Sequence, residues 1–256
     1  MMRKYLSVIA LSFLATNAAF AQSDIFGVEK APERKGFIFG VNGNFDVPGA
    51  DMAKRYGFSY RLGPSILYKT TSNWLFGAKG DFIFGGKIKE DSLMWNVRDK
   101  DGFFITNQGD RQGVGKFERG YAVGLQVGKI IPVVKGETNS GILVMLGAGF
   151  IQHKINIFDR DKVIYQVSGD YRKGYDRLTN GIYVEPYVGY NHLDRKGYFN
   201  FHIGLDLMAG FTQSRRDYQF DLMRRDDKNR VDLLFGLRGG WYVPLFKRKS
   251  EEIFFE

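Results

Sequence analysis

The feature of this chain that most restricts its fold is a strict alternation of apolar residues with polar or small ones. Between residues 199 and 211 every odd position is apolar, whereas the even positions include Asn200, His202 and Asp206. Residues 231–243 repeat the pattern, with Trp241 on the apolar side and charged residues on the other. A period of two is typical of β-strands that present one apolar face.

Six further segments show the same alternation, most weakly residues 142–150, where both faces are apolar. The apolar faces are rich in phenylalanine, and the opposite faces carry glycine and a few charges. The eight predicted strands are residues 36–46, 58–68, 74–84, 121–131, 142–150, 182–190, 199–211 and 231–243.

Beyond residue 36 no apolar stretch approaches the roughly 20 residues that a transmembrane helix needs. Strands can cross lipid only as a closed barrel, because every backbone polar group must find a partner there. We therefore predict an all-β fold, an eight-stranded antiparallel up-and-down transmembrane β-barrel. A soluble sandwich or a lipocalin-like barrel also alternates and is the competing prediction.

The connections between the predicted strands alternate in length. Those after the second, fourth and sixth strands are short, at 69–73, 132–140 and 194–197, whereas residues 87–116 and 159–180 form long loops. Outer-membrane barrels have short periplasmic turns and long extracellular loops. We expect the same sidedness here, with both termini in the periplasm.

The first residues have the composition of a secretory signal peptide. Met1-Met2-Arg3-Lys4 precedes a short apolar run and Ala19-Phe20-Ala21, which predicts export and cleavage after Ala21, with an uncleaved anchor as the weaker alternative. The chain has no cysteine, which excludes a lipobox and disulfides. The predicted organisation is a signal peptide at 1–21, a periplasmic segment at 22–35, the barrel at 36–246 and a tail at 247–256, first basic and then acidic and aromatic.

Charge narrows the range of partners. Without the signal peptide 35 basic residues face 28 acidic ones, a formal charge of +7. An exported basic barrel would meet the anionic headgroups of outer-membrane lipid and lipopolysaccharide rather than nucleic acid, and another envelope protein is a further expected partner.

Several charged residues fall on the predicted inner face of the barrel. An eight-stranded barrel is just wide enough to be filled by side chains, so these residues are expected to form a buried ion-pair network. An ion path or gate is the alternative. The predicted members are Arg61, Lys79, Asp81, Glu185, His202, Asp206, Asp232 and Arg238.

Enzymatic motifs are missing from the sequence. A serine hydrolase needs serine, histidine and an acid together, and the three histidines, His153, His192 and His202, have no evident serine partner. No metal signature, P-loop or dinucleotide fingerprint occurs. We predict no catalytic residue, no metal and no cofactor, with a lipid A-modifying enzyme as an alternative.

The loop at 165–183 interleaves tyrosines with arginines, the residue types preferred as anchors of binding surfaces. A loop that folds back on itself as a plug or hairpin is the competing interpretation. Residues 87–116 form the second candidate loop. The candidate binding residues are Tyr171, Arg172, Tyr175, Arg177 and Trp95.

The export signal, the alternating strands and the aromatic final strand resemble the small OmpA/OmpX-type outer-membrane barrels. They resemble more loosely the PorT-type barrels associated with type IX secretion in Bacteroidota. The resemblance covers residues 36–246 and departs at the end, where ten residues follow the last strand. It implies a non-enzymatic outer-membrane barrel that serves as a scaffold, binding or secretion/assembly-accessory protein through its extracellular loops; a small narrow pore is a further alternative.

Overall fold

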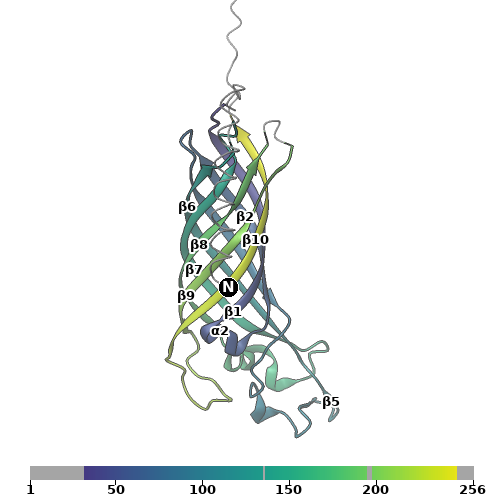
Figure 1. The fold of residues 1–256 in the computed structure, drawn as a ribbon. Coiled ribbons are helices and arrows are strands. Elements are labelled where there is room, and N and C mark those ends of the chain that lie inside the picture. Colours follow the sequence, from purple (N-terminus) through teal and green to yellow (C-terminus); the bar gives the residue numbers. More distant parts are fainter. Residues whose placement is uncertain (1–31, 135, 195–197, 247–256) are drawn as a thin grey trace, which may run out of the picture.

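Eight long antiparallel strands form one closed barrel in the computed structural model, which describes residues 32–134, 136–194 and 198–246 (Figure 1). Each strand pairs with the long strands adjacent to it in sequence, and the first and last strands close the ring. The strands are β1 (Gly36–Gly49), β2 (Ser59–Lys69), β3 (Trp74–Gly85), β6 (Gly115–Pro132), β7 (Gly141–Phe158), β8 (Thr179–Leu193), β9 (Asn200–Ser214) and β10 (Asn229–Phe246).

The predicted fold class is confirmed, because each of the eight predicted segments lies within a different strand of the ring, apart from a single residue at the start of the second and the seventh. β6 and β7 exceed their predicted lengths by the most residues. β6 and β7 each have 18 residues, and they stay paired beyond the apolar segment, up to Gly115 opposite Phe158. The outward residues of this extension include Arg119 and Lys154, so the apolar alternation ends while the backbone pairing continues.

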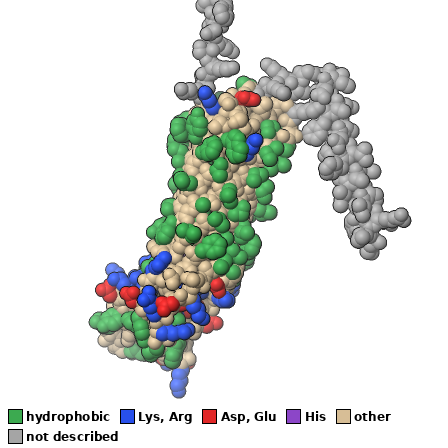
Figure 2. Space-filling model, turned by 90° about the vertical axis from the view of Figure 1, so that its left-hand side faces the viewer, with side chains coloured by type: hydrophobic (Ala, Val, Ile, Leu, Met, Phe, Trp, Pro, Cys, Tyr) green, Lys and Arg blue, Asp and Glu red, His purple; other side chains and the backbone are tan. Residues whose placement is uncertain are grey.

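The outer wall of the barrel is apolar. In β2 every second side chain is exposed, and these include Tyr60, Leu62 and Ile66, while Ser59, Arg61 and Ser65 between them are buried. Hydrophobic side chains cover the wall, and most charged side chains in this view gather at the end with the loops (Figure 2). A soluble sandwich is ruled out by the closed ring, and a lipocalin-like barrel would turn its apolar faces inward.

The two ends of the barrel differ, as the connection lengths predicted. One end carries three short turns, and the other carries the long connections (Figure 1). Short elements lie within these connections: α2 (Ala50–Arg55), η1 (Trp95–Val97), β4 (Phe104–Ile105), β5 (Arg111–Gln112), η2 (Tyr165–Val167) and η3 (Gly169–Gly174).

The barrel interior has three layers along its axis. Apolar side chains such as Ile38 and Leu67 fill the turn-side layer, and a second apolar group that includes Met208 and Leu234 fills the loop-side layer. Charged groups lie between them. On β8 the successive inward residues Tyr183, Glu185 and Tyr187 belong to the loop-side layer, the charged layer and the turn-side layer.

None of the helices in the described part of the chain has the length and apolar character needed to span a membrane. The predicted signal peptide with its cleavage site, most of the segment at 22–35 and the tail at 247–256 lie outside the described residues.

Candidate functional site

The middle of the barrel is held together by one buried guanidinium. Arg61 on β2 donates two hydrogen bonds to Asp46 at 2.7 and 2.8 Å and one to Asp206 on β9 at 2.9 Å. Its Nη1 lies 2.5 Å from Glu185 on β8. Since β2 and β8 occupy opposite walls of the ring, this last contact crosses the full lumen.

Two more cations complete this cluster. Lys79 lies 2.7 Å from Asp81 and 2.5 Å from Glu185. Arg238 lies 3.8 Å from Glu185 and stacks over the Tyr187 ring, at 5.1 Å from its centroid. A buried charge is tolerated only when it is paired, and here three cations face four carboxylates. We name this set the central charge cluster: Arg61, Lys79 and Arg238 with Asp46, Asp81, Glu185 and Asp206.

Asp46 was not among the predicted members of this cluster, although it is the main partner of Arg61. The signal was available, because Asp46 continues the inward series of Asn42 and Asn44 on β1. The two aspartates also need space beside β10, the strand that lies between β1 and β9. A Cβ at Gly236 would lie 2.0 Å from an Asp206 oxygen and 2.4 Å from an Asp46 oxygen, so glycine is required there.

Two predicted members lie elsewhere, which corrects the prediction of a single network. His202 forms a separate hydrogen-bonded group with the Tyr187 hydroxyl and the Asn42 amide oxygen, both at 2.9 Å. Asp232 lies toward the loops and accepts hydrogen bonds from Arg55 at 2.8 Å and Thr212 at 2.6 Å. Sequence alternation shows which face of a strand a residue occupies, but not which charged residues lie at the same level along the barrel axis. For this reason the sequence could not separate His202 and Asp232 from the other charged residues.

The Asp232 site contains a histidine and a carboxylate in contact, the arrangement most suggestive of catalysis. His153 Nε2 lies 3.0 Å from Asp232, and His153 Nδ1 lies 3.2 Å from the Tyr56 hydroxyl. His153 and Tyr56 are completely buried, and among the described residues no serine is hydrogen-bonded to the His153 ring nitrogens. This geometry anchors the connection between β1 and β2 through Arg55 and Tyr56. Among the described residues no group of His, Asp or Glu is arranged to hold a metal ion.

The three longest loops meet on a second buried guanidinium. Arg177, just before β8, contacts Glu90 in the loop after β3 at 2.5 Å and Asp221 in the loop after β9 at 2.7 Å. It also donates to Gln219. We call these joined loops, residues 86–114, 159–178 and 215–228, the cap. Burial lowers the pKa of Arg177, but the hydrogen bonds to Asp221 and Glu90 outweigh it, so the pKa is raised above the ordinary value and Arg177 stays charged.

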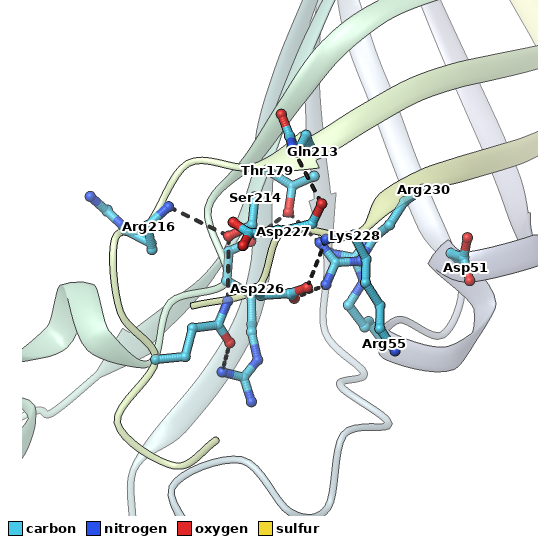
Figure 3. Close-up of polar contacts among 12 residues, drawn as sticks. Asp51, Arg55, Thr179, Gln213, Ser214, Arg216, Asp226, Asp227, Lys228 and Arg230 are labelled. Carbon is cyan, nitrogen blue, oxygen red and sulfur yellow. Dashed lines mark hydrogen bonds and ion pairs between the residues drawn. The ribbon is translucent and has the colours of Figure 1, made fainter. Parts of the chain in front are cut away.

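Further contacts seal the cap. Arg216 pairs with Asp176 at 2.5 Å, and Trp95 Nε1 donates to the Asp221 carbonyl at 3.0 Å. Gly174 allows the Phe220 ring to pack on the backbone, since a Cβ there would lie 2.2 Å from the ring. Figure 3 shows the last loop, where Arg230 pairs with Asp226 and Gln213 reaches the Asp227 carbonyl at 3.4 Å.

Between the cap loops lies a pocket of about 420 Å³. Most of its lining is aromatic, and Tyr171, Tyr175 and Phe220 form a run of contacting rings. The side-chain oxygen of Asn96 is buried there without a hydrogen-bond partner within the described structure. We call this site the aromatic pocket; its lining is Asn96, Val97, Tyr165, Gln166, Tyr171, Tyr175, Tyr218, Phe220 and Met223.

The predicted loop residues divide into two groups. Tyr171 and Arg172 lie at the surface, as does Trp95, which is 59% exposed. Tyr175 and Arg177 are buried inside the cap and contact the other loops. Sequence reasoning missed Phe220, Tyr218 and Met223, because their approach to Tyr171 depends on loops that are distant along the chain.

No protein-family model matches the chain, and no curated protein matches it. Among solved structures it is similar to Neisserial surface protein A, with a TM-score of 0.45 and 10% identity, over 83% of this chain and 99% of that one. It is also similar to Ail of Yersinia pestis in complex with the heparin analogue sucrose octasulfate, with a TM-score of 0.41, 12% identity and coverage of 82% and 99%. OprG of Pseudomonas aeruginosa matches with a TM-score of 0.36, 12% identity and coverage of 85% and 99%.

These similarities are too low to carry functional conclusions over to this chain. The fold is established by its own closed ring of strands. The chain is a small eight-stranded up-and-down β-barrel, the architecture that its resemblance to OmpA/OmpX-type barrels implied.

Proposed function

We propose that this chain is a non-enzymatic barrel of the outer membrane that binds another envelope protein through its cap. The observation that carries the proposal is the aromatic pocket, which three loops build on a rigid frame of paired strands. The cap lies on the extracellular side in this proposal, since long loops face outward in outer-membrane barrels.

The outer wall supports membrane insertion. Large apolar side chains are exposed on all eight strands, and examples are Phe39, Leu125, Ile182 and Leu237. Monomeric soluble proteins rarely expose contiguous apolar patches beyond a few hundred Å². Lipid and lipopolysaccharide would surround this wall and cover it.

The composition of the aromatic pocket supports a protein partner. Its lining carries no charged side chain, and five of its nine residues are tyrosines or phenylalanines whose rings contact one another, which is typical of an anchor site. The unpartnered Asn96 oxygen requires a hydrogen-bond donor. An apolar or aromatic side chain of the partner, together with one of its N–H or O–H groups, satisfies both requirements.

Site-specific photo-crosslinking in whole cells tests this proposal. A photoreactive residue in place of Met223, which is 65% exposed at the pocket, should give one discrete adduct. The adduct should disappear when Tyr171→Ser is added. A label at Tyr198, exposed at the opposite end of the barrel, is the control. The same adducts from both positions, or an adduct indifferent to Tyr171→Ser, would exclude the pocket as the binding site.

A further inference from the structure

Two cations face outward side by side on the barrel wall near the cap. Arg119 on β6 is directly opposite Lys154 on β7. Like charges in directly opposite positions destabilise a pair of strands. Within the described chain neither residue forms an ion pair. The adjacent carboxylate, Glu118, points into the barrel and accepts a hydrogen bond from Ser59 at 2.5 Å. We call Arg119 and Lys154 the basic pair.

The outward residues next to the basic pair change in character step by step. The next pair toward the middle of the barrel is Tyr121 opposite Gln152, and the one after that is Val123 opposite Phe150. The surface of a membrane protein typically changes from charged to amide and phenol groups, and then to hydrocarbon, on passing from the level of the lipid headgroups to that of the acyl chains. This order places the basic pair at headgroup level.

The polar band continues onto neighbouring strands. Asn180 on β8 donates to the Gln152 amide oxygen at 3.4 Å and accepts a hydrogen bond from Arg215 at 2.5 Å. Arg215 is exposed and adds a third cation to the band. Next to the band, toward the middle of the barrel, Ile182 is opposite Phe211, so the wall is apolar again.

A hollow of about 210 Å³ lies at the basic pair. Arg119, Lys154 and Gln152 contribute to its lining, together with Phe82 and Tyr121. One nitrogen of the Arg119 guanidinium donates to the Glu118 carbonyl at 2.7 Å. Guanidinium and ammonium groups are the usual ligands of phosphate, because charge-assisted hydrogen bonds to it are short and strong. The complete lining is Phe82, Arg119, Gly120, Tyr121, Gln152, His153 and Lys154.

We propose that this hollow binds the phosphate group of a membrane lipid, in the way expected for a phosphorylated glycolipid of the outer leaflet. The bound phosphate relieves the repulsion within the basic pair, and the acyl chains of the same lipid can lie on Val123 and Phe150. The proposal rests on the membrane insertion proposed above. It does not depend on the aromatic pocket.

Native mass spectrometry of the barrel with lipid A tests this inference. The wild type, reconstituted with lipid A and then released into detergent, should retain bound lipid A. When dephosphorylated lipid A is used instead, most of the signal of the protein–lipid complex should be lost. Replacing Arg119→Gln and Lys154→Gln together should reduce the retained fraction by about tenfold or more, since each cation near an anionic surface contributes about 1 kcal/mol.

Lys129→Gln is the matched control. Lys129 is an outward lysine on the same strand, but it stacks on Trp74 at the turn side, 5.2 Å from the ring. This variant should retain lipid A like the wild type. Equal loss in the double variant and in Lys129→Gln, or retention that ignores the phosphates, would overturn the assignment. Displacement of lipid A by millimolar inorganic phosphate would identify a free-phosphate site instead and would also overturn it.

A heat-dependent shift in gel migration separates the two proposals. Each protein should show the shift after insertion into vesicles, which confirms folding of the variants. A wild type that inserts but has no preference for phosphorylated lipid refutes only the lipid site. A wild type that never inserts refutes membrane placement and the lipid site together.

Discussion

Arg61 shows at the scale of a residue how a narrow barrel closes its lumen. Its guanidinium reaches three carboxylates on three different strands, and each of these contacts is buried. Such an ion pair adds little net stability compared with apolar packing, but loss of one partner leaves charges buried and unpaired. The same side chain therefore connects opposite walls and makes the core sensitive to substitution.

We expect Arg61→Ala to destabilise the barrel by about 3–5 kcal/mol, because it leaves Asp46 and Asp206 without their cationic partner and removes one of the cations that face Glu185. Urea unfolding in lipid vesicles, followed by tryptophan fluorescence, measures the change. Arg215→Ala, which removes an exposed arginine, should change the free energy of unfolding by less than about 0.5 kcal/mol. Equal effects of the two substitutions would contradict the role of the central charge cluster.

Gly236→Ala should cost about 1–3 kcal/mol, because its Cβ collides with the carboxylates of Asp46 and Asp206. Gly43 on β1 offers the comparison, since the nearest atom to a Cβ there is 4.0 Å away on Leu62. The same unfolding experiment should find Gly43→Ala close to the wild type. Similar midpoints for the two variants would show that the carboxylates can move apart without cost.

The elements differ in how far sequence alone could define them. The strands were predictable because a lipid-facing wall requires apolar residues at every second position, and residues 199–211 show this alternation clearly. The ends of β6 and β7 next to the cap were not, since Arg119 and Lys154 interrupt the apolar series there. The cap was least predictable. Its three loops are joined by the ion pairs of Arg177 with Glu90 and Asp221, and no local sequence pattern reveals contacts between residues so far apart along the chain.

Arg177 also adopts a left-handed backbone conformation, with φ at 51°, which is unfavourable for a side-chain-bearing residue. The contacts with Glu90 and Asp221 compensate this strain. Arg177→Ala should therefore loosen the cap while the strands stay paired. Limited chymotrypsin digestion, whose aromatic cleavage sites neither variant changes, should cut the cap loops about tenfold faster, with unchanged heat-modifiable migration. Arg172→Ala, at an exposed position of the same loop, should digest like the wild type. No difference between the two variants would contradict a joint at Arg177.

The whole molecule is a barrel with an apolar outside and a filled inside. Two apolar layers and the central charge cluster between them occupy its axis. A pore needs a continuous path of water, whereas the Arg61 contact with Glu185 joins opposite walls.

Planar bilayers containing the purified protein should therefore show no discrete conductance at moderate voltage. Widening the middle with Arg61→Ala should not open a path either, because the apolar layers remain. Regular single-channel steps that change on Arg238→Ala would contradict a closed lumen.

The most direct test of the central claim, that the apolar wall contacts lipid, uses the absence of cysteine from the chain. Single cysteines at Leu125, which is 72% exposed on the wall, and at Met223 in the cap can carry a nitroxide label in reconstituted vesicles. We expect the label at Leu125 to collide with dissolved oxygen and to be shielded from a water-soluble nickel complex. The label at Met223 should show the reverse. Equal access of the nickel complex to both positions would contradict a membrane-spanning barrel.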